Sequence, residues 1–230
     1  MPFDTDSWTT FCETVDRIAA SVRASSDDGQ VASYIPQLAQ QDPTRFAVCC
    51  VSVDGRVHTI GDVDERFTVQ STSKPTTYAL ALTEHGGSAV ARHVGREPSG
   101  QAFNSYYFPP DGRPQNALIN AGAIMTTSMI RSQAPKYERF EHVMRTWKTI
   151  CGPSNVGFDN STYLSEAAEP HRNMALASMM QCAGVFPKRT NLADTLELYF
   201  QCCSITCNVE GLARMGACFA NSGCLPDGTR

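Results

Sequence analysis

The chain has 230 residues, of which 42% are hydrophobic, and a formal net charge of −4 from 19 basic and 23 acidic side chains. This length and apolar fraction suffice for one large domain with a substantial core. The mixed, weakly acidic charge gives no electrostatic footprint for nucleic acid, so a small-molecule partner is expected. The longest apolar runs, such as "FAVCCV" at 46–51, are shorter than the roughly 20 residues of a membrane-spanning helix.

The first residues, "MPFDTDSWTTFCETVD", are acidic and lack both the apolar core of a secretion signal and the arginine-rich character of a transit peptide. They predict a cytoplasmic protein, or a mitochondrial one if a leader was removed. The ten cysteines include two adjacent pairs, Cys49-Cys50 and Cys202-Cys203, and no C-x-x-C motif. This pattern indicates buried, reduced thiols rather than a disulfide framework or a zinc site.

Helix and strand signals alternate over the first 90 residues. Apolar residues recur at helical spacing from Trp8 to Val22, behind Ser7, and predict an amphipathic helix. Two β-branched runs then flank Asp54-Gly55 in "RFAVCCVSVDGRVHTIGD", which is the signature of an antiparallel hairpin. A short strand, "RFTVQ" (66–70), leads into a helix that we expect to stop at Gly86-Gly87.

A long irregular stretch divides this part from a helical remainder. Residues 95–116, "GREPSGQAFNSYYFPPDGRPQN", are polar and rich in turn formers, and loops of this length are usually functional or disordered. A helix, a few strands and then many helices predict an α/β (α+β) fold in which an antiparallel sheet has flanking helices. Helical patterns follow the loop at 121–132, 140–151, 173–184, 192–203 and 209–223.

The stretch "QSTSKP" (70–75) places a serine and a lysine three residues apart at the start of a predicted helix, where their side chains share one face. A neutral Lys74, favoured by burial and by the positive end of the helix dipole, can take the hydroxyl proton of Ser71 and make it a nucleophile. The alternative is that Ser71 only caps the helix and Lys74 is solvated, because S-x-x-K alone is a weak motif. The strand-then-helix context favours the chemistry.

Further stretches accompany this motif, and together they resemble the serine-dependent glutaminases, relatives of the β-lactamase and penicillin-binding fold. The order and spacing match that family from about residue 30 to the end. The S-x-x-K motif is shared with the β-lactam-processing relatives, whereas "YIPQLA", "EPSG-x-x-FN" and "N-x-x-INAGAI" are specific to the glutaminases. The matching stretches are "ASYIPQLAQ" (32–40), "GREPSGQAFNS" (95–105), "NALINAGAI" (116–124), "LSEAAEPHRNMALA" (164–177) and "LELYFQCCSI" (196–205).

The resemblance implies a β-lactamase/transpeptidase-like fold in a single domain over residues 1–230, with a helical subdomain of roughly 75–205 inserted beside the sheet. It implies hydrolysis of L-glutamine to L-glutamate and ammonia through an acyl-serine intermediate, without a metal or cofactor. It further implies a homo-oligomer, dimer or tetramer. Ser71 and Lys74 are the implied catalytic pair, and the implied substrate-binding residues are Tyr34, Ser71, Asn120, Glu166, Asn173 and Tyr199.

The pocket residues suit the two charged ends of a free amino acid, but each has a second interpretation. A carboxylate at Glu166 pairs with an α-ammonium, and asparagine amides donate to an α-carboxylate. The two tyrosines also suit ordinary core aromatics, and the two asparagines stand where helix N-caps are expected. Glu166 lies in the charged segment "SEAAEPHRN", typical of a solvated surface, and only the resemblance selects it over Glu169.

The sequence departs from the family pattern at two places. Ala117 stands at a position where the family has proline. Members of the family also continue past a segment like "ANSGCLPDGTR" into a region with another active-site tyrosine and an oxyanion-binding N–H, so we expect this chain to be C-terminally incomplete. Two alternatives follow: a truncated, catalytically silent homologue that assembles with full-length subunits, or a β-lactamase/transpeptidase-like acyltransferase, expected outside the cytoplasm.

Overall fold

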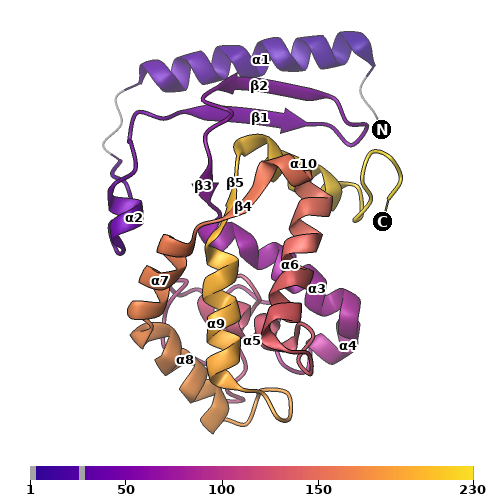
Figure 1. Ribbon diagram of the computed structural model, residues 1–230. Coiled ribbons are helices and arrows are strands. Elements are labelled where there is room, and N and C mark those ends of the chain that lie inside the picture. Colours follow the sequence, from indigo (N-terminus) through magenta and orange to yellow (C-terminus); the bar gives the residue numbers. More distant parts are fainter. Residues whose placement is uncertain (1–3, 26–28, 230) are drawn as a thin grey trace. The chain divides into compact units, whose positions relative to one another are not determined.

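The computed structural model describes residues 4–25 and 29–229. Its internal contacts divide the chain into two compact units (Figure 1). Unit 1 comprises Met1–Phe67, Thr146–Gly157 and Thr206–Arg230, and unit 2 comprises Thr68–Arg145 and Phe158–Ile205. The mixture of helices with small sheets agrees with the predicted α+β class. The single domain with a subdomain at roughly 75–205 stays a prediction.

The core of unit 1 is an antiparallel hairpin of β1 (Ala47–Val51) and β2 (Val57–Gly61). Cys49 pairs with Thr59 at its centre. The turn contains Gly55 at φ +88°, a left-handed conformation that glycine adopts without a Cβ clash. The hairpin predicted from Asp54-Gly55 is therefore confirmed.

The N-terminal helix begins earlier than its sequence pattern suggested. Helix α1 spans Thr5–Ala24, and its N-cap is Asp4, whose side chain accepts the backbone N–H of Ser7 at 2.8 Å. Ser7 is thus the residue that is capped, because a carboxylate three positions earlier reaches its N–H group. The predicted amphipathic helix is confirmed, with its start moved by one turn.

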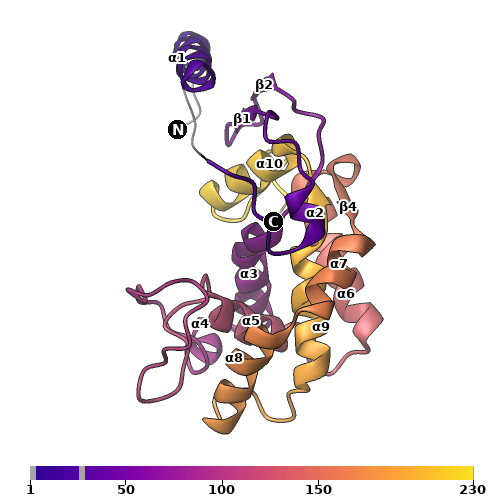
Figure 2. The same ribbon diagram turned by 90° about the vertical axis from the view of Figure 1, so that its left-hand side faces the viewer.

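The adjacent cysteines of β1 face two different helices. Cys50 lies close enough to Cys12 of α1 for the two thiols to interact, whereas Cys49 lies near Glu210 and Arg214 of α10 (Val209–Ala220). Since successive side chains of a strand point to opposite faces, α1 and α10 cover opposite faces of the hairpin (Figure 2).

All ten cysteines lie within the described residues, and none forms a disulfide. The reduced state of the thiols stays a prediction. The prediction that they are buried is wrong for Cys182, which is exposed on α8 (His171–Cys182), and only partly right for four others of intermediate exposure.

Three short strands carry the chain across three of the four boundaries between the units. They are β3 (Phe67–Thr68), β4 (Val156–Phe158) and β5 (Ile205–Cys207), and they form a sheet of order β3-β5-β4. The predicted strand at 66–70 is confirmed only at its centre. The other two strands have three residues each, too few for an alternating pattern to be recognised.

Unit 2 is a helical body around α5 (Asn120–Met129), all ten residues of which are buried. The run "AGAIMTTSM" carries no charge, which suits a helix enclosed on every side. Helices α3, α8 and α9 pack against it, and the five predicted helical patterns after the long loop are all confirmed. The remaining helices include α2 (Pro36–Ala39) in unit 1 and, in unit 2, α3 (Lys74–His85), α4 (Gly87–Val90), α7 (Asn160–Ala168) and α9 (Leu192–Cys203); α6 (Lys136–Cys151) extends from unit 2 into unit 1.

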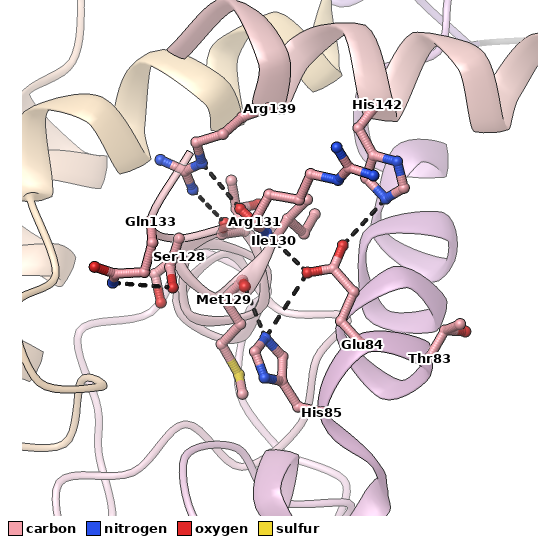
Figure 3. Close-up of polar contacts among 12 residues, drawn as sticks. Thr83, Glu84, His85, Ser128, Met129, Ile130, Arg131, Gln133, Arg139 and His142 are labelled. Carbon is pink, nitrogen blue, oxygen red and sulfur yellow. Dashed lines mark hydrogen bonds and ion pairs between the residues drawn. The ribbon is translucent and has the colours of Figure 1, made fainter. Parts of the chain in front are cut away.

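The C-terminal end of α5 is capped by side chains from neighbouring helices (Figure 3). Arg139 of α6 is only 5% exposed and donates to the carbonyls of Ile130 and Thr127, at 2.9 Å in each case. His85, the last residue of α3, lies with Nε2 2.8 Å from the carbonyl oxygen of Met129. These contacts satisfy carbonyls that have no partner inside the helix.

Glu84 holds the turn that follows α5. Its carboxylate accepts the backbone N–H of Arg131 at 2.8 Å, and its other oxygen lies 3.1 Å from Nε2 of His142 on α6 (Figure 3). Arg131 has φ +40°, a left-handed conformation unusual for a residue with a side chain. The C-terminal ends of α3 and α5 are therefore tied together through side chains.

None of the helices within residues 4–25 and 29–229 combines the length and apolar character needed to cross a membrane.

Gly122 allows the long loop to touch the first turn of α5. A Cβ at this position would lie 1.8 Å from the carbonyl oxygen of Asn116, which is backbone and cannot move aside cheaply. We expect Gly122→Ala to lower the free energy of unfolding by about 3 kcal/mol or more. The matched control is Gly216→Ala in α10, where nothing outside the backbone of its own helix lies within 4 Å of the added Cβ. The control should stabilise by about 0.5–1 kcal/mol, and equal urea midpoints for both variants would contradict the close approach.

Candidate active site

A short 3₁₀ turn, η1 (Gln70–Ser73), precedes α3 and contains Ser71. Helix α3 begins at Lys74, and its N-cap is Ser73, so the interpretation of Ser71 as the N-cap is wrong. Gln70 has φ +47°, a strained left-handed conformation directly before Ser71. Side chains hold this turn: Thr72 Oγ1 donates to the carbonyl of Val69 at 2.6 Å, and Ser73 Oγ to that of Gln70 at 2.7 Å.

The turn places Ser71 and Lys74 on one side of the chain. The backbone N–H of Lys74 donates to the carbonyl of Ser71, which is the i to i+3 bond of a 3₁₀ helix. Side chains three residues apart are eclipsed in that geometry, so these two share a face. Ser71 is exposed, whereas Lys74 is only 3% exposed. The interpretation of Lys74 as a solvated lysine is therefore wrong.

The Lys74 ammonium has an amide partner on the buried helix. Its Nζ donates to Oδ1 of Asn120 at 2.8 Å, and Nδ2 of Asn120 donates to Oδ1 of Asn173 at 3.2 Å. Asn120 is the first residue of α5, whose N-cap is Ile119, and Asn173 is the third residue of α8. Neither asparagine is an N-cap: Asn120 contacts the lysine directly, and Asn173 contacts Asn120.

Burial lowers the pKa of the Lys74 ammonium from its ordinary value of 10.5, and the nearby Cys203 opposes this shift. Cys203 on α9 is 5% exposed, and burial raises the pKa of its thiol well above the usual range. A neutral thiol gives the ammonium little compensation, so the environment favours neutral Lys74 more than solvent does.

Glu166 and Tyr199 lie beside the same thiol. Tyr199 of α9 is 5% exposed and hydrogen bonds with the Cys203 side chain, and the charge of Glu166 on α7 also acts on that thiol. One carboxylate oxygen of Glu166 is shielded from solvent. Glu169, in contrast, has a side chain 71% exposed and lies 3.7 Å from Nε2 of His171. The solvated surface predicted for this segment thus holds for Glu169 and not for Glu166.

The structure brings five of the predicted residues together in unit 2: Lys74 with Asn120 and Asn173, and Glu166 with Tyr199 around Cys203. Ser71 adjoins Lys74 through the 3₁₀ turn. Tyr34 belongs to unit 1, on the segment that leads into α2, and its place in the site stays a prediction.

Sequence reasoning missed two members of this cluster. Cys203 belongs to the thiols that the sequence predicts as structural. Its place near the lysine depends on the packing of α9 against η1, which no local pattern records. Phe103, whose ring centroid lies 5.6 Å from the Lys74 Nζ, was part of an irregular loop. The sequence feature that could have pointed to Phe103 is its place in the family-specific motif "EPSG-x-x-FN".

Two other features of the described residues lie apart from this cluster. A hollow of about 640 Å³ beside α4 is lined by Gly87, Arg96 and Arg113 among others, and none of the predicted site residues borders it. No group of three or more His, Cys, Asp or Glu side chains within residues 4–25 and 29–229 is placed to hold a metal ion.

The α+β architecture and the S-x-x-K turn at the head of a helix define the class, which is the β-lactamase-like fold. The family model "Glutaminase" matches residues 29–230. The glutaminase of Trichormus variabilis is 42% identical over 203 residues, which are 88% of this chain and 60% of that protein.

Two solved structures are similar in fold. A probable glutaminase, ybaS, superposes with a TM-score of 0.90 at 31% identity, covering 99% of this chain and 72% of that one. Mglu in its tris and glutamate form superposes with a TM-score of 0.85 at 34% identity. The superposition covers 95% of this chain and 48% of that one. The chain belongs to the glutaminase family. It spans less than two thirds of the length of the Trichormus variabilis protein.

The lowered pKa of Lys74 makes stability depend on pH. Below the folded-state pKa, folding buries an ammonium that the unfolded chain keeps solvated, so the destabilisation is fully present there and disappears as pH rises toward 10.5. Lys74→Met carries no such charge. We therefore expect wild type to gain stability relative to Lys74→Met as the pH rises through the alkaline range toward 10.5.

Urea midpoints of both proteins across this pH range test the expectation. The control is Lys148→Met, which removes an exposed lysine and whose difference from wild type should stay flat. A difference for Lys74→Met that is equally flat would contradict the burial of the ammonium.

Proposed function

We propose that this chain hydrolyses L-glutamine to L-glutamate and ammonia through a glutamyl ester on Ser71. The observation that carries the proposal is the buried Lys74 Nζ, held by Asn120 one helical turn from Ser71. Membership of the glutaminase family and the likeness to Mglu, solved in a tris and glutamate form, support the choice of substrate.

In the first half of the reaction, the Ser71 oxygen attacks the side-chain amide carbon of glutamine while neutral Lys74 takes the hydroxyl proton. The carbon–nitrogen bond then breaks, Lys74 returns the proton to the departing nitrogen, and ammonia leaves. Burial suits Lys74 to this role because the pKa of an effective base lies near the working pH. The Asn120 amide fixes the direction of the Nζ group.

In the second half, water attacks the glutamyl ester and Lys74 accepts a proton from it. The bond between the ester carbon and the Ser71 oxygen then breaks, Lys74 returns the proton to that oxygen, and glutamate is released. No metal or cofactor takes part in the proposed steps. The substrate's α-ammonium is assigned to Glu166, and its α-carboxylate to the amides of Asn120 and Asn173. Tyr199 and Tyr34 are assigned to the same pocket, Tyr34 on the resemblance alone.

The acyl-serine mechanism predicts that Ser71→Ala and Lys74→Ala each reduce ammonia release from L-glutamine by at least about 10³-fold with the fold retained. Ser88→Ala and Lys148→Ala are matched controls, since both side chains are exposed outside the cluster, and should keep wild-type turnover. A coupled ammonia assay with circular dichroism tests this. Release that survives Ser71→Ala would contradict the mechanism, and no release from wild type would favour the catalytically silent homologue.

Glu166→Gln should raise the KM for glutamine by about 10–100-fold and change kcat less, because it removes the charge that pairs with the α-ammonium. Glu169→Gln on the exposed end of the same segment should leave KM within about twofold of wild type. Steady-state kinetics of both variants decide the assignment. If KM rises for Glu169→Gln and not for Glu166→Gln, Glu169 is the carboxylate that pairs with the α-ammonium.

We further propose that the protein is a homo-oligomer, a dimer or a tetramer. The resemblance to the family supports the assembly.

A further inference from the structure

The long loop between α4 and α5 is closed at its base by backbone contacts. The N–H of Gly95 donates to the carbonyl of Pro114 at 2.8 Å, and that of Glu97 to the carbonyl of Gln115 at 3.0 Å. Asn116 adds a third bond from Nδ2 to the carbonyl of Glu97 at 2.9 Å. The loop therefore leaves and rejoins the helical body at one fixed place, without any helix or strand of its own in the described residues.

Phe103 is the point at which this loop reaches the proposed site. Its carbonyl accepts the backbone N–H of Asn120 at 2.8 Å, which satisfies the first donor of α5 in place of a capping side chain. The carbonyl of the next residue, Asn104, accepts Nη1 of Arg172 on α8 at 3.3 Å. Two helices that supply site residues thus fix the backbone around Phe103.

The side chain of Phe103 lies over the lysine. Its ring centroid is 5.6 Å from the Lys74 Nζ, within the range in which a cation interacts with an aromatic face. The side chain is nevertheless 60% exposed. Packing in the core therefore does not explain why a phenyl ring stands there.

We propose that Phe103 is a positioning residue for Lys74: its ring covers the amine, holds Nζ toward Ser71 in the charged state and keeps water from it. The inference rests on the proposed function, in which Lys74 becomes charged when it takes the serine proton and neutral when it returns it. An aromatic face stabilises the charged amine, and exclusion of water stabilises the neutral one, so the ring keeps both states accessible.

The other groups around Lys74 come from three helices. Asn120 of α5 accepts from Nζ, and Cys203 of α9 faces it as a buried thiol. Tyr199 and the Glu166 carboxylate lie behind Cys203, from α9 and α7. The ring of Phe103 is the group that the loop contributes to this set.

Two substitutions separate the effects of the ring. Phe103→Leu keeps apolar cover and removes the aromatic face, so the pKa of Lys74 falls and the acidic limb of the kcat/KM profile moves about half a pH unit lower. Phe103→Ala admits water, which stabilises the charged amine and raises the pKa of Lys74. The acidic limb of the kcat/KM profile therefore moves to higher pH. Phe103→Trp, with the stronger aromatic face, should retain the wild-type limb or move it higher.

Tyr107→Leu is the matched control, because Tyr107 is an exposed aromatic residue, 57% exposed, on the same loop. It should leave the limb unchanged. Opposite shifts for the leucine and alanine variants support a positioning role, since general damage to the loop would move both in one direction. If the acidic limb of the kcat/KM profile stays at its wild-type position in both the leucine and the alanine variant, the positioning role of Phe103 is overturned.

A second readout does not depend on turnover. The chain has four lysines, so the ¹³Cε signal of Lys74 can be assigned by its loss in Lys74→Met and followed through a pH titration by NMR. Phe103→Leu should lower the titration midpoint of that signal, and Phe103→Ala should raise it. If the two variants shift the midpoint as expected but wild type releases no ammonia, the proposed function is refuted and the role of Phe103 stands. Midpoints unchanged in both variants would refute the role of Phe103, whatever the activity.

Discussion

The structure of unit 2 depends on one buried amine. An ammonium removed from water is costly unless it is hydrogen bonded, and Lys74 obtains its bond from Asn120, the first residue of a helix with no exposed side. That helix is tied to α3 at both ends: by the lysine at the N-terminal end, and by Glu84 and His85 at the other. The distance between α3 and α5 is therefore fixed along their length, and the position of the reactive amine is fixed with it.

Much of the fold could be predicted because its signals are local. Asp54-Gly55 specifies a hairpin turn within four residues, and the helical runs repeat their apolar residues every three or four positions. The elements that escaped prediction are those whose signals are short or displaced. Strands β4 and β5 have three residues each, and α7 begins after its Asp159 cap and runs into a segment that resembles a charged surface.

The candidate site could be predicted in its residue types but not in its contacts. Ser71 and Lys74 are neighbours in the sequence, so their shared face follows from local geometry. The bond from Lys74 to Asn120 joins residues 46 positions apart. By sequence both asparagines suit helix caps equally well, and only tertiary packing directs Asn120 to the lysine and Asn173 to Asn120. Glu166 and Glu169 differ in burial and in their partners, properties that tertiary packing creates.

The chain crosses between the two units four times, and these crossings affect the order in which the protein can fold during synthesis. Every residue of unit 2 is made by Ile205, whereas unit 1 also needs α10, which covers the face of the hairpin that carries Cys49. Domains generally fold as they leave the ribosome, from the N-terminal side. Here the helical body can form first. Until α10 is made, one apolar side of the earlier β1–β2 hairpin stays exposed in the nascent chain and is accessible to chaperones.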